Sequence, residues 1–72
     1  MNNRIKVLRA ERDWSQQALA QQIGVSRQAI NAVERGKHDP SLQLAFDIAN
    51  QFEQRIEDIF FPEEKSNSND GE

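Results

Sequence analysis

Residues 15–36, SQQALAQQIGVSRQAINAVERG, constrain the fold more than any other stretch of this 72-residue chain. Two short segments with apolar residues at helical spacing meet there at Gly24-Val25-Ser26. Ser15 and Ser26 are good N-cap residues, and Gly24 tolerates the positive φ that often ends a helix. The stretch therefore predicts two short helices joined by a tight turn, which is the layout of a helix-turn-helix.

The rest of the chain predicts three further helices. A first helix is capped by Asn2 or Asn3 and extends to about Arg12, with Ile5 and Leu8 on its inner face. A fourth runs from Ser41 to about residue 52, and a short fifth follows at residues 56–60. The residues expected to face the core from the fourth helix are Leu42, Ala45, Ile48, Ala49 and Phe52. We expect an all-α fold of five short helices, with a short C-terminal strand at 59–61 that pairs with the N-terminus.

Length and composition indicate one small domain, at residues 1–61, followed by a tail. Residues 62–72, PEEKSNSNDGE, carry no large apolar side chain, which is typical of a disordered acidic tail. No apolar run is long enough to cross a membrane and no signal-peptide pattern precedes the domain, so we expect a cytoplasmic protein. The chain has no cysteine and a single histidine, His38, so we expect no metal and no cofactor. No motif indicates a small-molecule ligand.

The formal net charge of −3 hides an asymmetry along the chain. Residues 1–40 hold seven Lys and Arg against four Asp and Glu, whereas residues 41–72 hold two against eight. The N-terminal half is therefore basic and suited to a polyanion, while the C-terminal half is acidic. The acidic total does not argue against binding to double-stranded DNA.

The helix predicted at residues 26–35 separates apolar from hydrogen-bonding side chains. Ile30 and Val33 fall on one side, and Arg, Gln and Asn side chains fall on the other. Arg can form two hydrogen bonds to guanine, and Gln or Asn can do the same to adenine, while a small apolar side chain can touch a thymine methyl group. Such a face is most often merely solvated, but the adjoining turn and the basic half favour DNA. The residues expected to contact bases in the major groove are Arg27, Gln28, Asn31 and Ala32.

Phosphate contacts are expected from residues that flank this helix. Gln16 and Gln17 lie in the first turn of the preceding helix, where backbone N–H groups and the helix dipole attract an anion. Lys37 follows the reading helix and is expected to contact the DNA backbone. Arg35 and Gln17 each have two interpretations, a phosphate contact or plain solvated surface. Phosphate contacts position a protein on DNA without selecting a sequence.

Two stretches, IKVLRAERDWSQQALAQQIGVSRQAI and VERGKHDPSLQLAFDIA, resemble the XRE (Cro/C1-type) helix-turn-helix regulators. The ending IEDIFFP is similar to that of small single-domain cytolysin-repressor-like regulators. The resemblance implies a lambda-repressor-like fold and a homodimer on a palindromic operator. It also implies that Gln16 contacts phosphate and braces the reading helix, and that Arg9 and Glu34 form a structural ion pair. Trp14 departs from the pattern, since the family usually has a smaller aliphatic residue there.

Apolar residues beyond the predicted core suggest a dimer interface. Leu44 and Phe46 flank the buried stripe of the fourth helix, and Phe60 and Phe61 add two aromatic rings near its end. So much apolar area in a small domain favours contact with a second subunit, although a wide core stripe under the loops is the alternative.

These features predict a sequence-specific DNA-binding transcriptional regulator, acting as a repressor that occupies its operator as a homodimer. The main alternative is an antitoxin, or another interaction module, whose acidic C-terminal half binds a partner protein. An enzyme is disfavoured because one histidine without cysteine supplies neither a nucleophile–base pair nor a metal cluster.

Overall fold

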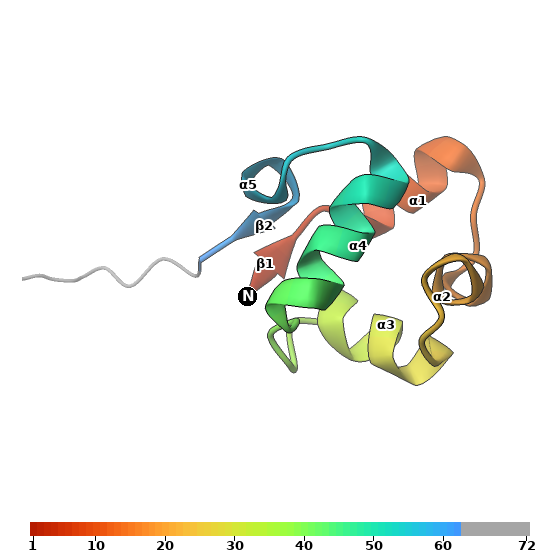
Figure 1. Ribbon diagram of the computed structural model, residues 1–72, viewed down its shortest axis with the longest axis horizontal. Helices are drawn as coiled ribbons and strands as arrows, with labels where there is room; N and C mark the ends of the chain where they lie inside the picture. Colours follow the sequence, from red (N-terminus) through yellow and green to blue (C-terminus); the bar gives the residue numbers. More distant parts are fainter. Residues whose placement is uncertain (63–72) are drawn as a thin grey trace, which may run out of the picture.

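The structure, a computed structural model, describes residues 1–62, so the predicted tail lies outside the described residues except for Pro62. This part of the chain forms five helices and one two-stranded sheet (Figure 1). The helices are α1 (Ile5–Arg12), α2 (Gln16–Ile23), α3 (Arg27–Glu34), α4 (Leu42–Phe52) and α5 (Ile56–Ile59). The strands are β1 (Asn2–Asn3) and β2 (Phe60–Phe61). Figure 1 shows α4 in the middle, with α2 and α3 on one side and α5 and the sheet on the other. The predicted all-α class with a short terminal strand is confirmed.

Serine residues explain where three of the helices begin. Ser15, Ser26 and Ser41 each have an extended backbone and accept a hydrogen bond from the backbone N–H three residues later, at 2.9, 3.1 and 3.1 Å. Each bond satisfies one of the N–H groups that a helix start leaves without a partner. The predicted starts of α2, α3 and α4 are therefore confirmed.

The start of α1 differs from the prediction of an asparagine cap. Arg4 is the N-cap residue and its side chain makes no capping hydrogen bond, because Asn2 and Asn3 are drawn into β1, which pairs antiparallel with β2. Asn3 nevertheless accepts a hydrogen bond from the Ile5 N–H at 3.1 Å. Its amide also donates to the Val33 carbonyl at 2.8 Å and so links β1 to α3.

The core lies between α4 and the surrounding elements. Its largest fully buried side chains, all less than 2 % exposed, are Phe52, Ile5, Leu19, Ile30, Ile48 and Ile59. Leu42 was predicted to join them, but 71 % of it is exposed. Leu42 stands in the first turn of α4, beside an open hollow rather than beneath another helix. The 3.6-residue period therefore predicts which side of α4 Leu42 lies on, but it does not predict where along the helix the core ends.

The two aromatic residues of β2 have different surroundings. Phe60 is 6 % exposed and belongs to the core, whereas Phe61 is 37 % exposed. Successive side chains of a strand point to opposite faces, which accounts for the difference. The prediction that Phe60 lies at a dimer interface is therefore wrong, because its ring has almost no surface left for a partner.

Trp14 fills the corner between α1 and α2. Its ring centroid lies 5.4 Å from that of Phe52, and the Arg12 guanidinium lies 5.4 Å from the Trp14 centroid and 5.7 Å from that of Phe52. Arg12 also donates to the carbonyls of Gln51 and Phe52, at 3.2 and 3.1 Å. The Arg12 guanidinium thus lies close to both rings, and the same arginine links α1 to the end of α4.

Candidate nucleic-acid interface

The helix-turn-helix consists of α2, the turn at residues 24–26, and α3. The N–H groups of Gly24 and Val25 both donate to the Ala20 carbonyl, at 2.8 and 3.0 Å, and so close the end of α2. Gly24 has φ 90°, a left-handed conformation that glycine adopts without the strain a Cβ atom brings. Val25 is half-buried and packs against the core. The turn therefore fixes α3 relative to α2 through both hydrogen bonds and packing.

The two sides of α3 differ in burial as the periodicity predicts. Ile30 and Val33 are buried, Arg27 and Gln28 are exposed, and Asn31 is half-buried. Within residues 1–62, the side chains of Arg27 and Gln28 make no hydrogen bond or ion pair. Ala32 is also half-buried and carries only a methyl group next to Asn31. The first turn of α3 thus presents hydrogen-bonding groups that are available to a ligand.

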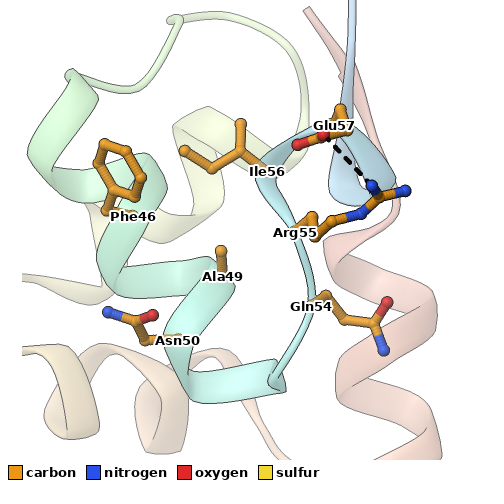
Figure 2. A pocket seen from close by; sticks show the side chains of 7 residues that line it. All are labelled: Phe46, Ala49, Asn50, Gln54, Arg55, Ile56 and Glu57. Atoms are coloured by element: carbon orange, nitrogen blue, oxygen red, sulfur yellow. Dashed lines mark ion pairs between the residues drawn. The ribbon is translucent and has the colours of Figure 1, made fainter.

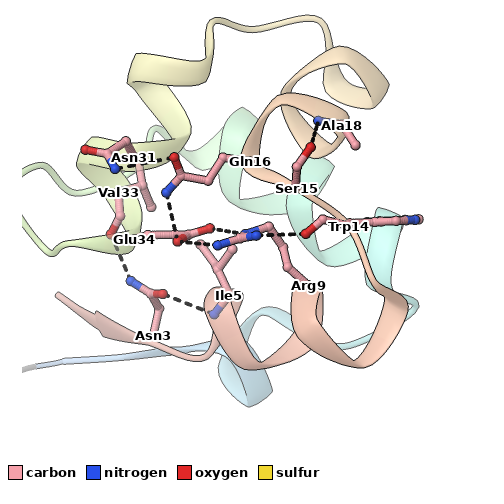
Figure 3. Close-up of polar contacts among 10 residues, drawn as sticks. All are labelled: Asn3, Ile5, Arg9, Trp14, Ser15, Gln16, Ala18, Asn31, Val33 and Glu34. Carbon is pink, nitrogen blue, oxygen red and sulfur yellow. Dashed lines mark hydrogen bonds and ion pairs between the residues drawn. The ribbon is translucent and has the colours of Figure 1, made fainter.

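A polar network joins α1, α2 and α3 behind this face (Figure 3). Arg9 binds both carboxylate oxygens of Glu34, through Nε and through Nη2, the latter at 3.1 Å. The side chains are only 14 % and 6 % exposed, respectively. Gln16 donates from Nε2 to Glu34 Oε1 at 3.1 Å, and Asn31 donates from Nδ2 to Gln16 Oε1 at 3.4 Å. Arg9 also donates to the Trp14 carbonyl at 2.8 Å, which attaches the network to the corner before α2.

Glu34 is therefore a structural group, and not a free acid at the surface. Three nitrogen atoms donate to its carboxylate, two from Arg9 and one from Gln16. This is the ion pair that the resemblance implied. The link from Gln16 to Asn31 was not predicted, because no local sequence signal reports a contact between side chains of different helices.

The other residues with predicted phosphate contacts lie at the ends of α2 and α3. Gln17 is exposed in the first turn of α2, where backbone N–H groups lack intrahelical partners. Arg35 is the exposed C-cap residue of α3, and Lys37 is exposed just beyond it. The Lys37 N–H donates to the Ala32 carbonyl at 3.0 Å, which holds that segment against the end of α3.

A family model described as helix-turn-helix matches residues 5–59, from the first residue of α1 to the last residue of α5. The chain belongs to the XRE-type helix-turn-helix family. It is 53 % identical over 64 residues to an HTH-type transcriptional regulator of Methanocaldococcus jannaschii, a match that covers 89 % of this chain and 97 % of the relative. It is 42 % identical over 66 residues to an HTH-type transcriptional regulator of Bacillus subtilis, covering 92 % of this chain and all of the relative.

Two solved structures share the fold of this chain. A hypothetical transcription factor from Neisseria, NHTF, superposes with a TM-score of 0.70 at 28 % identity and covers 75 % of this chain and 61 % of its own. A protein from Bacteroides fragilis with a suggested DNA-binding role has a TM-score of 0.71 at 31 % identity, covering 81 % of this chain and 94 % of its own. This chain is thus a DNA-binding helix-turn-helix transcriptional regulator, and α2 and α3 are its helix-turn-helix.

Large apolar side chains outside the helix-turn-helix are also exposed in this XRE-type regulator. Leu42, Phe46 and Phe61 are 71 %, 50 % and 37 % exposed, while Leu44 is half-buried against the core. Phe46 stands beside a hollow of about 370 Å³ between α4 and the start of α5 (Figure 2). The other residues that line this hollow are Ala49, Asn50, Gln54, Arg55, Ile56 and Glu57.

The perturbed ionisable groups lie away from the helix-turn-helix. A hydrogen bond from Arg55 to Asp58 holds the pKa of that carboxyl below its ordinary value, and the same contact raises the pKa of Arg55. Both residues belong to the α5 end of the molecule. Among residues 1–62, no helix is long and apolar enough to cross a membrane, and no cluster of three or more His, Cys, Asp or Glu could hold a metal ion.

Proposed function

We propose that this regulator is a repressor that binds a palindromic operator as a homodimer, with α3 in the major groove. The observation that carries the proposal is the pair of exposed side chains, Arg27 and Gln28, without partners in the described chain at the N-terminal end of α3. Helix-turn-helix proteins contact base edges with the N-terminal residues of their second helix. Base contacts are assigned to Arg27, Gln28, Asn31 and Ala32.

The phosphate contacts are assigned to residues that border this helix. Gln17 and the backbone N–H groups at the start of α2 face one strand, with Gln16 beside them. Arg35 and Lys37 supply positive charge after α3. Because such contacts release counterions, the affinity for any duplex should fall steeply as salt concentration rises.

The dimer is assigned to the apolar surface around Phe46. Phe46 projects beside a hollow on the same face, so a two-fold axis allows the ring of each protomer to enter the hollow of the other (Figure 2). Leu44 and Phe61 remain part of the proposed interface, and the exposed Leu42 joins it. In such a dimer the two copies of α3 should lie about 34 Å apart, matching half-sites centred about 10 bp apart.

The proposal is tested by selecting bound duplexes from random DNA and measuring the solution mass of the protein. We expect an inverted repeat with half-sites about 10 bp apart and the mass of a dimer. Phe46→Asp should give a folded monomer that binds the repeat weakly, whereas Val7→Asp should remain dimeric. Val7 is a matched control because it is 49 % exposed on α1, against 50 % for Phe46. Enrichment of a single half-site together with a monomeric mass would refute the dimer, and no enrichment would refute sequence-specific binding.

If the regulator represses by occupying its operator, its effect on transcription should depend on where the operator lies. The dimer should block transcription in vitro when its operator overlaps the promoter and should have no effect when the operator lies far downstream. Activation from an upstream operator would contradict the assignment as a repressor.

A further inference from the structure

We infer that Glu34 sets the orientation of the Asn31 amide through Gln16, and so helps determine which base α3 reads. The inference rests on the proposed function, because it concerns the base contact assigned to Asn31. It makes Gln16 and Glu34 positioning residues for specificity, in addition to their places in the scaffold.

The first step is the chemistry of the buried carboxylate. Glu34 is 6 % exposed and is bound on both oxygens by the Arg9 guanidinium, so it is an ionised group that can only accept hydrogen bonds. Gln16 must therefore turn its amide nitrogen toward Glu34, as the 3.1 Å contact shows. The opposite orientation would place two oxygen atoms against each other. The Gln16 oxygen is consequently the atom that faces α3.

The orientation of the Gln16 amide in turn determines the orientation of the Asn31 amide on α3. Gln16 Oε1 accepts a hydrogen bond from Asn31 Nδ2 at 3.4 Å, which uses one of the two amide hydrogens of Asn31. If the Asn31 amide were flipped, its oxygen would face the Gln16 oxygen, and this hydrogen bond would be lost. The second N–H and the Oδ1 atom of Asn31 remain, and neither has a partner within residues 1–62. Asn31 therefore offers one donor and one acceptor in a fixed order, the pair that adenine binds through N7 and N6.

The network makes a different prediction from a plain phosphate contact by Gln16. If Gln16 only bound phosphate, its loss would weaken binding to all sequences to a similar extent. If it orients Asn31, its loss should alter the preference at one base pair, the same one that Asn31 reads. The preferences at the bases read by Arg27 and Gln28 should stay unchanged, because within residues 1–62 these exposed side chains make no hydrogen bond or ion pair with the network residues.

The experiment compares base preferences, by selection from a randomised half-site, for the full-length wild type and for variants. Asn31→Ala identifies the base pair that Asn31 reads. Gln16→Met keeps the side-chain length, leaves the Arg9–Glu34 pair intact, and should reduce the preference at that base pair at least about fivefold. Gln22→Met, at an exposed glutamine of α2 with no assigned DNA contact, is the matched control and should leave the base profile unchanged. Circular dichroism confirms that each variant is folded.

Two results would overturn the inference. One is a Gln16→Met protein with an intact base profile and uniformly weaker binding, and the other is a changed preference only at bases not affected by Asn31→Ala. Glu34→Gln gives a second test, since a neutral amide can donate as well as accept and should relax the same base pair in folded protein. A wild type that enriches no sequence would instead refute the proposed function itself, and the inference would fall with it.

Discussion

Replacing Glu34 with alanine should be among the most destabilising changes on the polar side of this domain. The Glu34 side chain is 6 % exposed and receives hydrogen bonds from Arg9 and Gln16. Without it, the Arg9 guanidinium, itself 14 % exposed, keeps only its bond to the Trp14 carbonyl among the contacts within residues 1–62. The variant therefore leaves a positive charge largely buried and without a counterion.

The size of the effect follows from this burial. Removing one partner of a fully buried ion pair costs roughly 3–5 kcal/mol. The residual exposure of Arg9 and its bond to the Trp14 carbonyl bring the expected loss to the lower end, about 3 kcal/mol in the free energy of unfolding. In a domain of this size each kcal/mol lowers the midpoint of thermal unfolding by about 4–8 °C, so a decrease of roughly 12–24 °C is expected.

Thermal and urea unfolding followed by far-UV circular dichroism measure this loss. Glu11→Ala is the matched control, because Glu11 is an exposed glutamate of α1. It should change the free energy of unfolding by less than about 0.5 kcal/mol. The double variant Arg9→Met/Glu34→Met should lose less than the sum of its single variants, because it leaves no unpaired buried charge. A loss below about 1 kcal/mol for Glu34→Ala, as for a surface pair, would refute the reasoning.

Three further outcomes are expected. Arg12→Ala removes the cation beside the Trp14 ring and should both lower the thermal midpoint and shift the tryptophan emission, and an unchanged spectrum would contradict the packing. Gly24→Ala should cost about 1–2 kcal/mol in urea unfolding through its positive φ alone, since within residues 1–62 no residue other than its chain neighbours lies within 4 Å of the added Cβ; a neutral result would contradict the strain. The Asp58 carboxyl should titrate by NMR below its ordinary pKa, and Arg55→Ala should raise that pKa toward the ordinary value. Because the folded pKa is the lower one, any stabilisation from this exposed contact is present at neutral pH and is lost as pH falls through it.

Local signals predicted the helix-turn-helix well. Serine caps and the glycine at position 24 act through the backbone within a few residues, so Ser15, Ser26 and Gly24 could be assigned from sequence alone. The periodicity of α3 likewise separated Ile30 and Val33 from the polar face.

Predictions that depend on what covers a residue were less successful. Leu42 has the helical phase of the core, but within residues 1–62 it borders an open hollow and is 71 % exposed. Phe60 and Phe61 are identical neighbours in the sequence, so composition cannot show which ring is buried. The pairing of β2 with β1 decides it. Asn3 lies in β1 rather than at the N-cap of α1, and no local signal indicates this because its partner Phe60 is distant in the sequence.

The candidate site was predicted as a set of residues, but not as a network. The family pattern implied the Arg9–Glu34 pair and a bracing role for Gln16. The contact between Gln16 and Asn31 depends on the crossing of α2 and α3 and on side-chain orientation, which sequence spacing does not specify. The polarity of the Asn31 amide therefore became apparent only in the structure.

The most direct test of the central claim is the ratio of affinities for the selected operator and for a scrambled duplex, measured for wild type, Arg27→Ala and Gln28→Ala. Both variants should remain folded and lose at least about fivefold in this ratio, since a good bidentate base contact gives about 1–3 kcal/mol of discrimination. Arg4→Ala removes the same charge from an exposed position before α1 and should leave the ratio unchanged. An unchanged ratio in both Arg27→Ala and Gln28→Ala would contradict the assignment of α3 as the helix that reads DNA.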